Sequence, residues 1–156
     1  MLQSLVEGRK YEEDQMFENL TKEDSKLINA EIANEYGLTL EQTKKVLESK
    51  GATVQLFFAS ETNESTFREK CKEALKSTKP MILVNFQVSK VGYEWEIDVG
   101  HFSPIAAYNE TEDKFLLLDV WPQEKRWWIP ATNLFDSLNT FDFDSKKSRG
   151  WLFVSK

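Results

Sequence analysis

The sequence predicts an α+β protein in which helices come first and an antiparallel sheet follows. Amphipathic segments bounded by helix-capping residues occupy the first half of the chain, up to about residue 77. From residue 81 onward, short apolar runs are separated by turn residues, a pattern typical of strands. Helices followed by strands, rather than alternating with them, indicate an α+β order. With 156 residues, 40% of them hydrophobic, the chain is large enough for one domain with one core.

Two helices are expected early in the chain. The first spans about 22–36, with Thr21 as a candidate N-cap and Gly37 at its end. The second begins at Thr39, whose side chain can form a capping box with Gln42. Both helices carry apolar residues at helical spacing, so each is expected to bury one side.

The rest of the first half is assigned to an arm, a strand and a third helix. Residues 1–24 are polar and charged with weak periodicity, so they are interpreted as an N-terminal arm of uncertain order ahead of a domain at 25–156. A strand is expected at 52–59, and a third helix at about 64–77.

Strands dominate the second half. The almost wholly apolar run 81–86 is typical of a strand buried on both faces. A tryptophan-rich loop is expected at 121–130, followed by a short helix near 134–139 that Asn133 would cap. The other expected strands are 101–108, 114–120 and 150–155.

Charge and composition argue against several classes of partner. The formal net charge is −6, which disfavours a nucleic-acid groove or an anionic membrane surface. No run of about 18 apolar residues suggests a transmembrane helix, and the first eight residues are too short and interrupted for a signal peptide. One cysteine and one histidine cannot build a disulfide or a zinc site. A reducing compartment, the cytoplasm, is therefore expected, although a targeting signal upstream of this sequence would escape notice.

One pair of residues has the chemistry of a catalytic dyad. His101, the sole histidine, opens one predicted strand, and Asp119 closes the next. A hairpin centred on residue 110 would place them directly opposite each other, on a face shared with a further set of residues. That set is Ser103, Ile105, Ala107, Phe115 and Leu117. A carboxylate can orient an imidazole that acts as a general base, but a purely structural His–Asp pair fits this pattern equally well.

A nucleophile is harder to find. Cys71 is the only thiol, and it lies on the apolar face of the predicted helix 64–77. Reactive cysteines usually need a helix N-terminus or a cationic neighbour, so Cys71 is interpreted as a core residue. Ser103 is expected to form a local hydrogen bond rather than to attack a substrate.

Several motifs resemble those of the phytochelatin synthase family. The segment Gly-His-Phe-Ser-Pro-Ile-Ala-Ala-Tyr-Asn at 100–109 resembles that family's histidine motif, and Leu-Leu-Leu-Asp-Val at 116–120 resembles its aspartate motif. The ending Ser-Arg-Gly-Trp-Leu-Phe-Val-Ser-Lys at 148–156 matches a later segment of the family. The resemblance covers about 25–156 and keeps its order, and upstream it is closest to the short bacterial form.

The resemblance implies a papain-like fold and a cysteine acyltransferase. Members transfer γ-Glu-Cys from glutathione to a second glutathione, making metal-chelating peptides for heavy-metal detoxification, and bacterial relatives mainly hydrolyse glutathione. His101 would be the general base and acid, and Asp119 would orient it. Asn85 and Gly100 would line the acyl site, and Arg149 would hold substrate or the active-site loop. No protein-bound cofactor or metal site is implied, because cadmium or zinc would enter as glutathione thiolates.

The sequence departs from the family pattern in two places. The segment that carries the family's catalytic cysteine and oxyanion glutamine is not matched, so an N-terminal lobe is expected to be missing or supplied separately. After Asp119, Pro122 stands where the family has an arginine.

Three functions therefore remain open. The chain can be part of a glutathione γ-glutamylcysteinyltransferase, a glutathione-binding pseudoenzyme, or part of a bacteriocin-processing-type cysteine peptidase. The serine-arginine-glycine ending and Pro104 favour the synthase family. A homodimer is a further possibility, since the tryptophans 121, 127 and 128 would leave an apolar surface if a lobe were absent.

Overall fold

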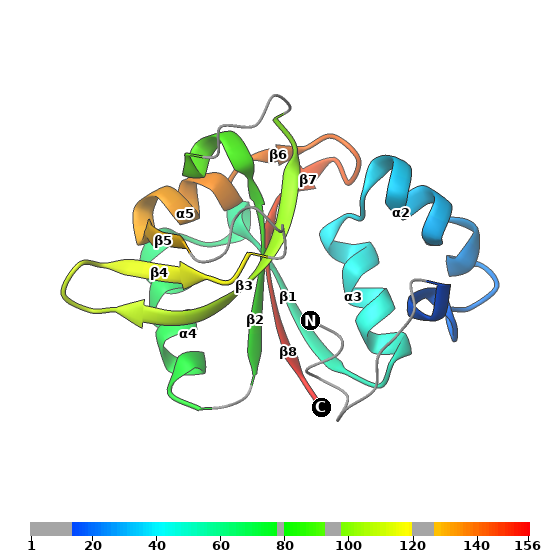
Figure 1. Cartoon of the computed structure of the whole chain (residues 1–156), viewed down its shortest axis with the longest axis horizontal. Helices are drawn as coiled ribbons and strands as arrows, with labels where there is room; N and C mark the ends of the chain where they lie inside the picture. The colour runs from blue at the N-terminus through cyan, green and yellow to red at the C-terminus, as the bar shows by residue number, and fades with distance from the viewer. Residues whose placement is uncertain (1–13, 78–79, 93–97, 120–126) are drawn as a thin grey trace.

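A six-stranded antiparallel sheet organises the part of the chain that the structure describes (Figure 1). The structure is a computed structural model, and it describes residues 14–77, 80–92, 98–119 and 127–156. The strands lie in the order β1-β8-β2-β3-β4-β5, and a separate two-stranded ladder joins β6 to β7. The helices are α2 (Ala30–Tyr36), α3 (Leu40–Ser49), α4 (Glu64–Leu75) and α5 (Ala131–Leu138). The main-sheet strands are β1 (Thr53–Phe58), β2 (Met81–Gln87), β3 (Gly100–Asn109), β4 (Lys114–Leu117), β5 (Trp127–Pro130) and β8 (Gly150–Ser155). The small ladder is formed by β6 (Phe141–Asp142) and β7 (Lys147–Ser148).

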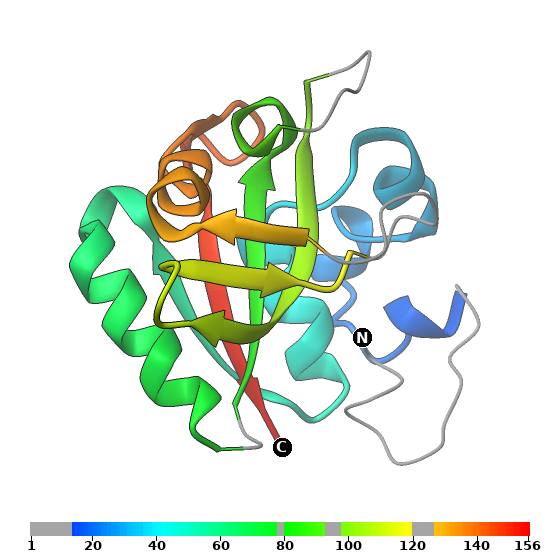
Figure 2. The same cartoon turned by 60° about the vertical axis from the view of Figure 1, so that its left-hand side comes forward.

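Helices cover both faces of the sheet. Helices α2 and α3 lie on one side of it and α4 and α5 on the other, as Figures 1 and 2 both show. Successive residues of a strand point to opposite faces, so β2 and β8 supply two cores. Val84 and Trp151 join the core under α4 and α5, whereas Leu83 and Leu152 join the core under α3. The prediction that the strand at 81–86 is buried on both faces is confirmed, as is the mixture of helices and antiparallel sheet.

The second predicted helix begins as expected. Thr39 Oγ1 accepts a hydrogen bond from the Gln42 amide at 3.2 Å, and Gln42 Oε1 accepts one from the Thr39 amide at 2.9 Å. This reciprocal pair is a capping box, and the helix α3 starts directly after it. Two local side-chain bonds were therefore sufficient to fix this boundary.

The first predicted helix is wrong as a continuous segment. Thr21 lies before a short 3-10 turn, η2 (Asp24–Lys26), and its hydroxyl accepts from the Asp24 amide at 3.0 Å, while Glu23 holds the N-cap position. Asn29 then adopts an extended conformation, and its side chain accepts from the Ile32 amide to start α2. An internal N-cap that satisfies free backbone donors thus divides the expected helix in two.

The last helix begins earlier than predicted. Asn133 lies inside α5, which starts at Ala131 after Pro130. The Ala131 amide donates to the carbonyl of Asp113 at 2.9 Å, so the turn between β3 and β4 supplies an acceptor at the start of this helix. This contact joins distant segments and has no local sequence signal.

The predicted arm lies partly outside the described residues. Within the described part of it, 3-10 helix η1 (Asp14–Phe17) leads to Leu20, and Met16, Phe17 and Leu20 pack against the α3 core. The predicted loop at 121–130 also lies mostly outside the described residues, and its last four residues form β5. No helix in the described residues is long and apolar enough to cross a membrane.

Candidate active site

His101 and Asp119 are in contact. Their Nε2 and Oδ1 atoms lie 2.9 Å apart. The Asp119 side chain is fully buried and that of His101 is 13% exposed, so water has little access to this contact. Proximity of these two residues is as the sequence predicts, and their chemical roles stay a prediction.

The register that joins the two residues differs from the predicted one. The structure pairs Ile105 with Leu117, and the Leu118 amide donates to the Pro104 carbonyl at 3.0 Å. Continuing this register sets Asp119 beside Ser103, so His101 reaches it diagonally rather than from directly opposite. Diagonal neighbours on one face of an antiparallel pair are still within reach of long side chains.

A β-bulge accounts for the shift. The pairing changes between Ile105 and Ala107, so β3 holds one extra residue there. Beyond the bulge the face is supplied by Tyr108, whose ring packs 4.8 Å from that of Phe115. Ala107 was therefore wrongly placed on the shared face, whereas Ser103, Ile105, Phe115 and Leu117 are all buried.

The surroundings of His101 favour a neutral imidazole. Its ring stands perpendicular to that of Phe86, with the centroids 5.5 Å apart. Burial lowers the pKa of His101 below its ordinary value. The neighbouring Asp119 carboxylate acts against this shift when it is ionised. An ionised carboxylate can only accept, so beside an ionised Asp119 a neutral imidazole would carry its hydrogen on Nε2.

The three predicted substrate residues meet at one hollow. Asn85, Gly100 and Arg149 line a cavity of about 420 Å³, to which His101 also contributes. The Asn85 side chain is 95% buried, and its Oδ1 has no hydrogen-bond partner among the described residues. The Nε atom of Arg149 is also buried and has no hydrogen-bond partner among the described residues, while its Nη1 donates to the Phe141 carbonyl at 2.8 Å. An unused acceptor and an unused donor therefore meet at this cavity.

The side chains of Asn85 and His101 lie on opposite faces of the sheet. Asn85 pairs with Phe102, and Phe86 pairs with His101. Phe102 packs with the α3 core and Phe86 belongs to the core under α4 and α5. Gly100 lies on the same face as Phe102, because alternate residues of a strand share a face, and Arg149 lies against it. The cavity thus adjoins the N-terminal end of β3, where His101 also contributes to its lining.

The sequence analysis gave no site role to several acidic and aromatic residues of this cavity. Asp98, Asp142 and Asp144 line it, as do Tyr36 and Phe143. Asp98 accepts from the Ser89 amide and from the Gln87 side chain, and its pKa is lowered chiefly by these hydrogen bonds, against the effect of burial, with a contribution from Arg149. They come from three segments of the chain, at Tyr36, at Asp98 and at 142–144, so no single spacing in the sequence connects them all.

Cys71 is not part of this site. It lies on α4, fully buried in the core with Phe67 and Ala74. Burial raises the pKa of its thiol well above the ordinary range, so the thiolate is strongly disfavoured. Within the described residues no group of three or more histidine, cysteine, aspartate or glutamate side chains could hold a metal ion.

Comparison with known proteins places the chain in a family. The family model for phytochelatin synthase matches residues 5–151. This chain belongs to the phytochelatin synthase family. It is 32% identical to glutathione gamma-glutamylcysteinyltransferase 3 of Lotus japonicus over 124 residues, which cover 77% of the chain and 25% of that relative. It is 31% identical to glutathione gamma-glutamylcysteinyltransferase 1 of Triticum aestivum over 77% of the chain and 24% of the relative. It is 27% identical to glutathione gamma-glutamylcysteinyltransferase 2 of Arabidopsis thaliana over 81% of the chain and 27% of that relative.

This chain therefore spans about a quarter of the length of these relatives. The family model also reaches upstream of residue 25, where the motif resemblance begins. Its match ends at residue 151, so it includes His101, Asp119 and the cavity residues.

Proposed function

We propose that this chain supplies the acid–base pair and the acyl-donor pocket for γ-glutamylcysteinyl transfer from glutathione. The observation that carries the proposal is the contact of 2.9 Å between His101 Nε2 and Asp119 Oδ1 beside the cavity of Asn85, Gly100 and Arg149. A buried carboxylate that holds one imidazole nitrogen leaves the other nitrogen to exchange protons with reactants. Family membership supports the reaction class.

In the proposed reaction His101 acts first as a base and then as an acid. Asp119 holds Nε2, so Nδ1 takes the proton from a thiol, and the thiolate attacks the carbonyl between the cysteine and glycine of glutathione. The carbon–nitrogen bond to glycine breaks, and the imidazolium returns its proton to the glycine amine. The resulting thioester is cleaved by the amine of a second glutathione or by water, either of which gives its proton to His101. The carbon–sulfur bond breaks, and the imidazolium returns that proton to the departing thiolate. The first outcome is transfer and the second is hydrolysis.

The cavity suits the zwitterionic end of a γ-glutamyl group. Arg149 offers a charged donor for the α-carboxylate, and Asn85 offers an amide. Asp98 and Asp142 offer carboxylates for the α-ammonium group. A volume of about 420 Å³ lies in the usual range for small-ligand sites. Cadmium or zinc would take part as glutathione thiolates in the substrate, and free thiols of this kind suit a reducing compartment such as the cytoplasm.

The attacking thiol is not supplied by Cys71, which is buried on α4. We therefore propose that a further segment or a separate lobe, in a papain-like arrangement, brings the thiol to His101. The burial of Cys71 also favours a second function, that of a glutathione-binding pseudoenzyme. Without such a thiol, this chain would bind glutathione and leave it intact.

Turnover is the first test of the proposal. The purified chain is incubated with glutathione, with and without cadmium, and γ-Glu-Cys, glycine and longer γ-Glu-Cys peptides are measured by mass spectrometry. The same assay is run on Cys71→Ser and His101→Ala. We expect little or no product from the chain by itself, and products that depend on His101 once a thiol-bearing segment is added. Products that vanish in Cys71→Ser would overturn the assignment of Cys71 to the core.

Binding is the second test, and it separates the two functions. Calorimetric titration with γ-Glu-Cys is compared between the wild type, Arg149→Lys and the surface control Lys76→Met. We expect at least about a tenfold loss of affinity in Arg149→Lys, because lysine cannot reproduce the guanidinium fork. The control should bind as the wild type does. Binding without turnover in the presence of the thiol-bearing segment would favour the pseudoenzyme, and equal affinity in all three proteins would contradict the pocket.

A further inference from the structure

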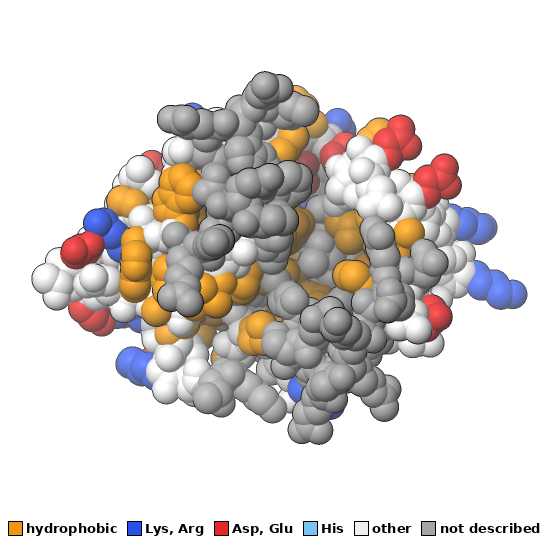
Figure 3. Space-filling model, viewed as in Figure 1, with side chains coloured by type: hydrophobic (Ala, Val, Ile, Leu, Met, Phe, Trp, Pro, Cys, Tyr) orange, Lys and Arg blue, Asp and Glu red, His pale blue; other side chains and the backbone are white. Residues whose placement is uncertain are grey.

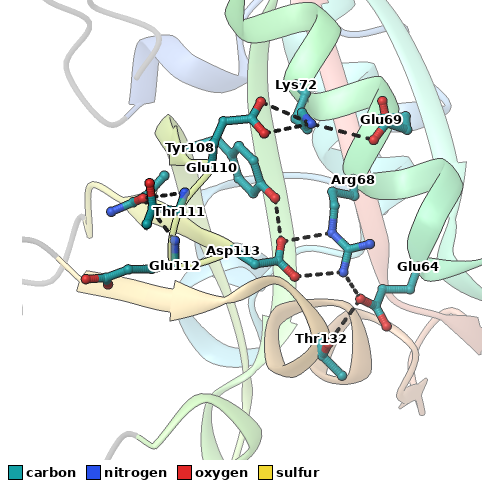
Figure 4. A network of polar contacts seen from close by, with 11 residues as sticks. Glu64, Arg68, Glu69, Lys72, Tyr108, Glu110, Thr111, Glu112, Asp113 and Thr132 are labelled. Atoms are coloured by element: carbon teal, nitrogen blue, oxygen red, sulfur yellow. Dashed lines mark hydrogen bonds and ion pairs between the residues drawn. The ribbon is translucent and has the colours of Figure 1, made fainter.

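A polar network ties the turn of the β3–β4 hairpin to helix α4 (Figure 4). Arg68 on α4 donates from Nε and Nη2 to the two carboxylate oxygens of Asp113, at 2.9 and 3.0 Å. Tyr108 donates its hydroxyl hydrogen to the same carboxylate. Glu64 also pairs with Arg68 and accepts a hydrogen bond from Thr132 at the start of α5. A two-pronged contact of this kind fixes direction as well as distance.

The network holds the residues next to the bulge. Tyr108 follows directly after Ala107, where the register of the hairpin changes. Its ring packs on Phe115 on one side, and Lys72 Nζ lies 5.3 Å from its centroid. Asp113 has a positive φ of 52°, so the residue that Arg68 binds also lies in the turn where the chain changes direction. Both sides of the hairpin are thus fixed just beyond the bulge.

The position of the bulge decides whether His101 meets Asp119. The pairs are Tyr108–Phe115 on the turn side of the bulge and Ile105–Leu117 on the dyad side. A shift by one residue moves every side chain of a strand to the other face. If the extra residue of β3 were taken up elsewhere, Asp119 would point away from the face that carries His101. The contact between His101 and Asp119 therefore depends on the position of the β-bulge between Ile105 and Ala107.

We propose that Arg68, Asp113 and Tyr108 act as a register lock that positions the His101–Asp119 pair. They are positioning residues, because they act through the hairpin and do not touch the dyad. The inference rests on the contact between the two side chains and not on the reaction proposed above. It goes beyond that reaction by assigning a role to three residues far from the cavity.

The sole histidine of the chain allows a direct test. The ¹⁵N and ring ¹H resonances of His101 report its tautomer, its pKa and its hydrogen bond to Asp119. They are recorded for the wild type, Arg68→Met, Arg68→Lys, Asp113→Asn and Tyr108→Phe. Asparagine tolerates positive φ, so Asp113→Asn removes the charge without straining the turn. Asp119→Asn provides the spectrum of a broken dyad, and Lys76→Met removes a different ion pair, with Glu73, from the same helix.

We expect one set of imidazole resonances in the wild type and in Lys76→Met. In Arg68→Met and Asp113→Asn we expect a second set, near the Asp119→Asn positions, with a population of about 10% or more. Arg68→Lys should restore part of the loss. A loss of general stability alone would lower the melting temperature and leave the resonances of the folded protein unchanged, and that result would overturn the proposal. Tyr108→Phe keeps the ring and should fold. If its His101 spectrum, and those of Arg68→Met and Asp113→Asn, all matched the wild type, the register lock would be refuted. Melting temperatures are measured in parallel, and spectra are compared well below each one.

Discussion

Two glycines, Gly150 and Gly100, leave room for close neighbours that a Cβ atom would displace. A Cβ atom on Gly150 would lie 2.0 Å from the carbonyl oxygen of Phe57, so β1 could not remain paired with β8 at its present distance. A Cβ atom on Gly100 would instead lie 2.8 Å from Nε of Arg149, at the flexible end of a side chain. The first glycine therefore protects the sheet, and the second gives room to the guanidinium group.

This difference predicts opposite effects of two alanine substitutions. Gly150→Ala should lower the free energy of unfolding by about 3 kcal/mol or more, because backbone has to move to relieve the overlap. Gly100→Ala should change stability less and weaken γ-Glu-Cys binding, because Arg149 can turn aside. Urea unfolding and calorimetric titration of both variants check this. Equal stability losses at the two positions would contradict it.

The pH dependence of stability follows from the burial of His101. Burial lowers its pKa in the folded protein, so the unfolded chain binds the proton more readily. The stabilisation is fully present above the ordinary histidine pKa of 6.5, and it is lost as pH falls through the lower folded value. We expect the free energy of unfolding to fall more steeply with acidification in the wild type than in His101→Gln. Wild-type stability that instead rises on acidification would show that the Asp119 charge outweighs burial.

At the scale of the element, local side-chain bonds set where helices begin. Thr39 and Gln42 form their capping box within four residues of sequence, and the sequence predicts it. Asn29 caps α2 by the same kind of bond, but Thr21 has an equally good signal upstream, so the sequence favoured one longer helix. Capping residues compete, and tertiary packing decides between them.

The capping box offers a stability test at this scale. Thr39→Ala removes the acceptor for the Gln42 amide and should cost about 1 kcal/mol. Thr39→Ser keeps the hydroxyl and should cost less, so it serves as the matched control. Thermal unfolding followed by circular dichroism measures both. An alanine variant as stable as the serine variant would show that packing of α3, rather than its cap, maintains the helix start.

The hairpin shows what local patterns leave undetermined. A constant register drawn through His101 and Asp119 predicts their contact, and the contact exists, but through a different register. The register lock proposed for the bulge after Ile105 includes Arg68, which lies on α4 and is distant from the hairpin in the sequence. Alternation of apolar residues cannot reveal one extra residue, because Ala106 and Ala107 fit either face.

For the whole molecule, the cavity forms where separate segments converge. Asp98 precedes β3, Asp142 ends β6, and Arg149 precedes β8. Motif resemblance identified Asn85, Gly100 and Arg149 as site residues, but it assigned no role to the acidic residues. Their meeting depends on the strand order, which the sequence does not state.

The distribution of exposed hydrophobic side chains on the surface also follows from this strand order. Figure 3 shows hydrophobic side chains gathered over the region of β3 and β4, with charged side chains mainly toward the margins. Leu118 and Trp128, near the dyad end of β4 and on edge strand β5, are 40% and 45% exposed. Trp128 pairs with Leu116, which shares a face with Leu118, so the two side chains expose apolar area on the face opposite the dyad. This area is available to the proposed thiol-bearing lobe or to a second copy of the chain.

The buried thiol reports on the stability of the whole molecule. Cys71 is inaccessible in the folded protein, and its raised pKa further suppresses the thiolate, so alkylation requires an opening that exposes α4. We expect iodoacetamide labelling to be slow in buffer and to accelerate with urea in parallel with global unfolding. Val84→Ala, which leaves a cavity in the same core, should raise the logarithm of the labelling rate in proportion to its loss of stability. Labelling that is fast in buffer and insensitive to Val84→Ala would mean that α4 opens locally, and a thiol able to do so would again be a candidate nucleophile for His101.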